Sequence, residues 1–270
     1  MLKRISIILL SFLFVLNESC NKSQTPVIPP VTPPNSVFNY GDSIFYKKNQ
    51  SNDYVISPTN TLAGKYASFP DGLVLDGNSG AVNVSKSESG LKYMIAFIPD
   101  GKADTLLSFI TISGINYKDG FYKLNDGDSI AFSIYNAIPG VAIPGIGSGS
   151  LFDVGSSCND QGCNVNVNNG TINLAQTVRN GVFGSTPSNN DRHEFEMTYQ
   201  LNDGSNISTN KLKVKLYYFE TMNDVTPEAD SIISSRQGSI IGPGNIVPAA
   251  FAFNNAQIKP RPPCIFIVGH

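Results

Sequence analysis

Apolar and polar residues alternate with a period of two along much of the chain beyond residue 37. The alternation is clearest at 91–97, 193–201 and 212–218, where apolar residues occupy every second position. Side chains of a β-strand point alternately to the two faces of a sheet, so each run predicts a strand with one buried face. Gly-, Asn- and Asp-rich segments separate the runs and are typical of turns. The pattern therefore predicts an all-β fold built from short strands.

One hairpin is predicted by its turn alone. Leu73 and Leu75 lie on one face of a first strand, and Val82 and Val84 continue that face after the chain reverses. The intervening DGNSG, residues 76–80, places glycines where a tight turn requires positive φ.

The residues around this hairpin resemble the bacterial Ig and cadherin-like domains. The resemblance is carried by the string Gly72-Leu73-x-Leu75-Asp76-x-x-Ser79-Gly80-x-Val82 and by the apolar, tyrosine-containing strand that follows. It implies an Ig-like β-sandwich over residues 38–115, of a kind that is commonly repeated as a spacer or adhesive module on cell surfaces. The acidic calcium motifs of true cadherins are not evident, so calcium-dependent adhesion is not implied.

Residues 116–270 predict a second β-rich domain, again of sandwich type. The runs DRHEFEMTYQL and KLKVKLYYF flank the turn sequence LNDGS at 201–205, which predicts an antiparallel pair of strands. In such a pair the glutamates of the first strand face the lysines of the second. The charged residues are Glu194, Glu196, Lys211, Lys213 and Lys215. We interpret these charges as structural.

One short helix and a last strand complete the predicted elements. Thr226 can cap the helix, Pro227 suits its first position, Glu228 favours its positive end and Gly238 can end it. The apolar run CIFIV at 264–268 predicts a strand buried on both faces.

The first 19 residues have the organisation of a signal peptide. Lys3 and Arg4 precede an apolar run at 5–16, which is too short to cross the ~30 Å core of a bilayer. The small Ser19 directly precedes Cys20. This arrangement resembles the lipobox of bacterial lipoproteins, and the resemblance implies cleavage before Cys20 and acylation of its sulfur. An ordinary secreted protein with an unpaired early cysteine is the alternative.

A proline-rich stretch follows the cysteine. Residues 21–36 hold five prolines and a single charge, which favours an extended, semi-stiff spacer. Residues 20–37 therefore predict a lipidated tether, with the membrane as partner through the anchor. The expected location is the cell envelope, at the outer membrane or the cell surface.

Composition excludes one class of partner. Charged residues make up 15% of the chain and the formal net charge is −2. Nucleic-acid binding requires clustered Lys and Arg to displace counterions, so no nucleic-acid partner is expected.

Three cysteines lie beyond the tether. Cys158 and Cys163 flank NDQG, a turn-forming insert, and a disulfide that closes this small loop is the favoured prediction. The same spacing could form half of a metal site, but no second pair or nearby histidine completes one, so no metal is expected. Cys264 is left over. It is either a buried thiol or an alternative disulfide partner for Cys158 or Cys163.

No catalytic constellation stands out. His193 and His270 are the only histidines, and no GxSxG elbow, HExxH, Walker loop or dinucleotide fingerprint is present. We therefore expect no cofactor and no enzymatic activity. The alternative is a glycosidase-like envelope hydrolase with its site in residues 116–270. Glu194 and Glu196 lie one strand period apart, roughly 6.6–6.8 Å, which fits a carboxylate pair.

The leading functional hypothesis is a binding, adhesion or scaffolding module for an unknown protein or glycan. A carbohydrate platform combines exposed aromatic rings with amides. The candidate aromatics are Tyr217 and Phe219, which point away from the face of Tyr218. The candidate amides are Asn164, Asn166 and Asn168. Burial of the two aromatics between packed sheets is the alternative.

Overall fold

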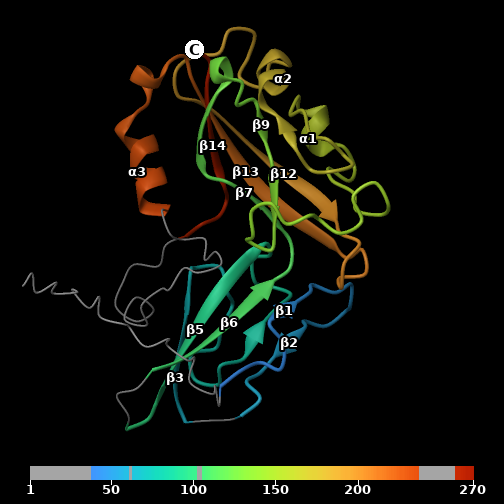
Figure 1. Ribbon diagram of the computed structural model, residues 1–270, viewed down its shortest axis with the longest axis vertical. Helices are drawn as coiled ribbons and strands as arrows, with labels where there is room; N and C mark the ends of the chain where they lie inside the picture. Colours follow the sequence, from blue (N-terminus) through green and yellow to red (C-terminus); the bar gives the residue numbers. More distant parts are fainter. Residues whose placement is uncertain (1–37, 61–62, 102–104, 237–258) are drawn as a thin grey trace, which may run out of the picture. The chain divides into compact units, whose positions relative to one another are not determined.

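Within the residues that the structure describes, the strands form two four-stranded sheets and three two-stranded pairs (Figure 1). The structure is a computed structural model, and it describes residues 38–60, 63–101, 105–236 and 259–270. All described residues belong to one compact unit, Ser36–His270. The predicted all-β class is confirmed. No helix in the described ranges has the length and apolar character needed to cross a membrane.

The first sheet has the strand order β1-β6-β5-β3. Its strands are β1 (Ile44–Phe45), β3 (Gly64–Phe69), β5 (Leu91–Pro99) and β6 (Leu106–Ile112). The short edge strand β1 runs parallel to β6, and the other neighbours are antiparallel. The Ig-like sandwich expected over residues 38–115 stays a prediction.

The predicted hairpin at 73–84 is confirmed. Leu75 forms a β-bridge with Val82, and Val82 begins the short strand β4 (Val82–Asn83), which pairs with β2 (Val55–Ile56). One Asp76 carboxylate oxygen accepts hydrogen bonds from the amides of Asn78 and Ser79 at 2.9 and 2.7 Å. The turn is thus closed by an aspartate side chain as well as by its backbone.

The faces of β5 match the period-two pattern. Alternate residues from Leu91 to Phe97 are fully buried in the core of the first sheet, together with Phe38, Val82 and Ile112. Met94 and Ala96, on the opposite face of β5, are also buried, against Phe69. Burial of both faces explains why β5 reads as an almost continuous apolar run.

The second sheet has the strand order β12-β13-β14-β8. Its strands are β12 (Asp191–Gln200), β13 (Thr209–Phe219), β14 (Cys264–Val268) and β8 (Gly120–Lys123). The predicted antiparallel pairing of β12 with β13 is confirmed, and its register sets Glu196 opposite Lys213. Lys211 reaches Glu196 at 2.6 Å and Lys213 reaches Glu194 at 3.3 Å, so the two charged faces complement each other as expected.

Strand β14 occupies the interior of this sheet. It lies between β13 and β8 and runs parallel to both. All five of its residues are buried, which confirms the prediction of a strand covered on both faces. One face contributes Ile265 and Ile267 to the main core, and the other contributes Phe266 to a second cluster beneath α3.

Three helices are present in the described residues, although the pattern predicted one. The predicted helix is α3 (Pro227–Arg236), where the Ala229 amide donates to the Thr226 hydroxyl at 3.3 Å. Gly238, its expected end, lies outside the described residues. The missed helices, α1 (Ser157–Asp160) and α2 (Leu174–Arg179), are too short to show a helical period.

The remaining strands form two small antiparallel pairs, and short 3-10 turns connect elements. These are β7 (Ile115–Tyr117) with β10 (Ser133–Tyr135), β9 (Ile130–Ala131) with β11 (Ile172–Asn173), and the turns at Leu124–Asp126 and Met222–Asp224.

Separate hydrophobic clusters lie against the two large sheets. Hydrogen bonds link the region of the first sheet to that of the second. Ser89 Oγ lies 3.0 Å from the Tyr199 hydroxyl, and Ser113 Oγ donates to Asp203 at 2.7 Å. The boundary proposed between 115 and 116 stays a prediction.

Candidate functional site

The asparagines expected to present a row of amides do not lie on a strand. Val165 makes only an isolated bridge, and residues 167–169 form a turn. The Asn166 side chain accepts a hydrogen bond from the Asn168 amide at 2.9 Å, which closes this turn. Asn164 binds through its backbone amide to Thr177 Oγ1 at 2.9 Å. The predicted platform is therefore corrected, because local side-chain to backbone hydrogen bonds take the place of a strand.

The two aromatics proposed for sugar stacking are buried. Tyr217 is 5% exposed and Phe219 is fully buried, in a cluster with Phe266 and with Ala229 of α3. The ring centroids of Tyr217 and Phe266 lie 4.6 Å apart. Figure 1 shows α3 alongside this end of the sheet. The prediction that these two aromatics form an exposed stacking surface is therefore wrong, because residues of α3 and β14 pack against them.

Cys158, Cys163 and Cys264 are free, buried thiols in the structure, and no disulfide forms within the described residues. Burial raises the pKa of Cys158 and Cys163, and the Asp153 carboxylate raises both further. The disulfide predicted for Cys158 and Cys163 thus finds no support in this structure. Cys20 lies outside the described residues.

Two residues of the hydrolase alternative, His193 and Glu194, line one pocket of about 270 Å³, whereas Glu196 lines a different one. Glu194 and Glu196 are each held by lysines on the same face of the sheet. The His193 ring lies against Phe195, and its Nε2 atom has no hydrogen-bond partner in the described part of the chain. Burial lowers the pKa of this histidine. Within the described residues, no group of three or more His, Cys, Asp or Glu side chains could hold a metal ion.

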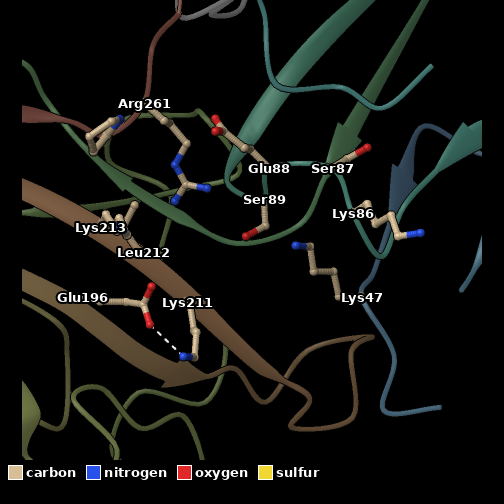
Figure 2. Close-up of a pocket in the computed structure, with 11 residues that line it drawn as sticks. Lys47, Lys86, Ser87, Glu88, Ser89, Glu196, Lys211, Leu212, Lys213 and Arg261 are labelled. Carbon is tan, nitrogen blue, oxygen red and sulfur yellow. Dashed lines mark hydrogen bonds and ion pairs between the residues drawn. The ribbon is translucent and has the colours of Figure 1, made fainter. Parts of the chain in front are cut away.

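A different group of residues forms a pocket of about 230 Å³ (Figure 2). Its walls come from the segment after β1, the turn before β5, strands β12 and β13, and the segment before β14. Basic side chains dominate the lining. The lining residues are Lys47, Lys86, Ser87, Glu88, Ser89, Glu196, Lys211, Leu212, Lys213, Arg261 and Pro262.

Most of these basic groups are neutralised locally. Lys86 pairs with Asp53 at 2.7 Å, and Lys211 and Lys213 pair with the glutamates of β12. Lys47 and Arg261 form no ion pair with any described residue. The pocket thus contains two positive charges without a direct acidic partner.

Arg261 is the most constrained of these groups. Its side chain is 5% exposed, and Nη2 donates to the Ile115 carbonyl at 3.0 Å. Its Nε has no acceptor among the described residues. Glu88 Oε2 is likewise buried, and no described residue donates a hydrogen bond to it. Buried groups of this kind are costly to leave unpaired, so they mark a place where further hydrogen bonds can form.

The pKa values report the same environment. Burial lowers the pKa of Lys47 to about 8, and the positive charge of Arg261 contributes, while Glu88 opposes the change. Burial also raises the pKa of Glu88, against the opposing effects of Arg261, Lys259 and Lys47. Figure 2 shows the Arg261 guanidinium and the Glu88 carboxylate in the same part of the pocket. Three ionisable groups far apart in sequence therefore share one partly dehydrated space.

Sequence reasoning did not find this pocket. Its two unpaired cations come from segments without a regular pattern, one after β1 and one between prolines at 260 and 262. The available signal was an arginine next to a run expected to be fully buried, since a charge in that position needs a specific reason.

No family model matches this chain, and no curated protein matches it. Among solved structures, human protocadherin-24 EC1-2 (Form II) is 7% identical, with a TM-score of 0.23, and the match covers 67% of this chain and 95% of that chain. The extracellular domains 3–5 of Drosophila OTK are 10% identical, with a TM-score of 0.20, over 66% of this chain and 62% of theirs.

A tri-modular GH5 endo-beta-1,4-glucanase from Bacillus licheniformis is 12% identical, with a TM-score of 0.21, over 67% of this chain and 38% of that chain. Similarities of this size assign no function. The Ig/cadherin-like resemblance of the first region therefore stays a prediction.

Proposed function

We propose that this protein is a lipid-anchored cell-envelope protein that acts as a non-enzymatic binding module, with its ligand in the basic pocket. The observation that carries the binding role is Arg261, a buried cation that forms no ion pair among the described residues and whose Nε has no acceptor there, set in the wall of a cavity. A buried charge opposes folding unless it is paired. Sequences tolerate such local conflicts mainly at functional sites.

The anchor is proposed from the sequence. Cleavage before Cys20 and acylation of its sulfur would fix the chain to a membrane, and several acyl chains together hold stably. The proline-rich residues 21–36 would keep the folded part clear of the lipid headgroups. The proposed location is the outer membrane or the cell surface, and the proposed partner is a glycan or a protein.

Labelling with a radioactive fatty acid tests the anchor. We expect label on the native chain and none on the Cys20→Ala variant. Label retained by the variant would show that the lipid is attached to another residue.

A second experiment separates binding from hydrolysis. The full chain is incubated with a panel of envelope glycans and peptides, while its thermal unfolding and the integrity of each compound are followed. We expect at least one compound to raise the Tm and to be recovered intact. Cleaved product that disappears in a Glu194→Gln, Glu196→Gln variant would establish the hydrolase alternative instead.

A further inference from the structure

The charges in the basic pocket leave a small positive excess. The ion pairs of Lys86, Lys211 and Lys213 account for three of the five cations. Two cations remain, those of Lys47 and Arg261, and one carboxylate without an ion pair, that of Glu88. The groups without a partner thus sum to one positive charge, which matches one negative charge on a ligand. A dianion would be opposed by Glu88.

The unsatisfied atoms specify more than charge. Arg261 Nε requires an acceptor, and a carboxylate is a preferred partner of a guanidinium. Glu88 Oε2 requires a donor, which a hydroxyl group can supply. A ligand that carries a carboxylate and a neighbouring hydroxyl would satisfy both atoms at once.

The size of the pocket limits how much of a ligand it holds. Its volume of about 230 Å³ lies below the roughly 300–1,000 Å³ of pockets that enclose a drug-sized molecule. The space therefore suits one unit of a larger molecule, with the rest of that molecule outside.

We infer that the basic pocket binds a single carboxylated, hydroxyl-bearing unit, such as the uronic acid residue of an acidic glycan. The Arg261 and Lys47 cations face the carboxylate, and Glu88 accepts a hydrogen bond from a ring hydroxyl. This inference rests on the proposed binding function and names the chemistry of that same site.

Three closely matched sugars test the inference by calorimetric titration of the full chain. Methyl glucuronide carries one carboxylate, methyl glucoside is neutral, and glucose 6-phosphate carries a phosphate in the equivalent place. We expect the glucuronide to bind at least about tenfold more tightly than either of the others.

Substitutions in the pocket assign the recognition to residues. Lys47→Met should weaken glucuronide binding at least about fivefold, since a charged hydrogen-bonding partner is lost. Glu88→Gln should shift the preference toward glucose 6-phosphate, because it removes the charge that opposes a dianion. Lys86→Met is the matched control. It lies in the same pocket but is already paired with Asp53, so it should change affinity less than twofold. Thermal unfolding verifies that each variant is folded.

The outcomes separate the inference from the function on which it rests. Equal binding of the neutral sugar, or loss of binding in Lys86→Met equal to that in Lys47→Met, would overturn the inference. Failure of all three sugars in a chain that binds another compound of the envelope panel would also overturn it, and would leave the binding function standing. If no sugar and no compound of the panel binds, both the inference and the proposed binding function are wrong.

Discussion

Two segments of this chain fold into the same turn from different sequences. We call residues 75–87 the first turn and residues 165–177 the second turn. In each, the first residue forms a β-bridge with the eighth. The sixth residue of each is a glycine with positive φ, and its amide donates to the carbonyl four residues earlier, at 2.9 Å in the first turn and 2.8 Å in the second.

The contacts that hold the two turns also correspond. A tyrosine hydroxyl donates to the carbonyl of the turn glycine, from Tyr40 in the first turn and from Tyr117 in the second. A buried hydroxyl at the last position, Ser87 or Thr177, donates to a backbone carbonyl four residues earlier and accepts from a backbone amide on the other side of the hairpin.

The surroundings of the turns differ. The second turn runs into α2, whereas the first ends in further turns before β5. In the first sheet β1 pairs directly with β6, but in the second sheet β14 lies between β13 and β8. The comparison teaches that a few positions specify the turn, namely the glycine, the side-chain acceptor at its start and the hydroxyl at its end. The sheet around it can gain a strand without altering it.

The largest expected effect comes from the glycines. A Cβ on Gly80 would lie 2.7 Å from a ring atom of Tyr66, and one on Gly170 would lie 2.5 Å from a ring atom of Phe152. Both residues also have positive φ. We expect Gly80→Ala and Gly170→Ala each to lower the free energy of unfolding by about 2–4 kcal/mol, measured by denaturant titration.

Gly127→Ala is the control for this pair, since Gly127 has φ of 78° but open space around its Cβ position. It should cost only about 1 kcal/mol, through backbone strain alone. If Gly170→Ala cost no more than this control, close packing at the turn would play no part.

The next largest effect is expected from removing the buried hydroxyls of Ser87 and Thr177. Thr177→Val and Ser87→Ala each remove a donor and an acceptor, and take away the hydroxyl that accepts from the Asn164 or Val74 backbone amide. We expect losses of about 1–3 kcal/mol in each turn by thermal or denaturant unfolding. A large loss in one turn with none in the other would show that the shared hydrogen bonds are not equivalent.

The tyrosines should have a smaller effect. Tyr40→Phe and Tyr117→Phe keep the ring and remove the hydrogen bond to the turn glycine, and Tyr117→Phe also removes a weak contact with the Met197 sulfur at 3.8 Å. Each should lower the free energy of unfolding by about 1–2 kcal/mol. Combining Tyr117→Phe with Gly170→Ala should cost less than the sum of the two, because both perturb one contact region.

The smallest effect is expected at Asp76, the side-chain acceptor at the start of the first turn. Hydrogen bonds from the Ser79 and Asn78 amides, with a smaller one from the Ser79 hydroxyl, lower the pKa of Asp76. A lowered folded-state pKa means that the carboxylate adds stability above its ordinary pKa, and that this stability is lost as pH falls through the lowered value.

The second turn has Asn166 in the place of Asp76, so it lacks this dependence of stability on pH. Asp76→Asn should therefore flatten part of the acid limb of the stability profile, and Asn166→Asp should add to it, in unfolding experiments between pH 2 and 6. Identical acid limbs in all three proteins would contradict this assignment.

The same two turns show why one was predicted from sequence and the other was not. DGNSG has two glycines and an aspartate, which is an unambiguous turn signal. The segment that leads into the second turn, residues 164–170, reads NVNVNNG. Its alternation imitates a strand, although Asn166 uses its side chain to close a turn. Periodicity alone does not distinguish these outcomes when the polar residue is an asparagine.

Other elements were predictable because pattern and charge agreed. The β12–β13 pair combines alternation with complementary charges, and both are confirmed in the register. The pattern gave the faces of Tyr217 and Phe219 correctly relative to Tyr218, but not what covers them. The basic pocket depends on Lys47, Glu88 and Arg261, whose proximity arises only from tertiary structure.

The interior position of β14 has a consequence for biogenesis. Its neighbour β8 is made early, near residue 120, yet the two can pair only after residues 264–268 have been synthesised. Until then the facing edges of β8 and β13 expose unpaired backbone groups, which can template association with other chains. Partly synthesised chains are therefore more prone to associate through these edges than the complete fold is.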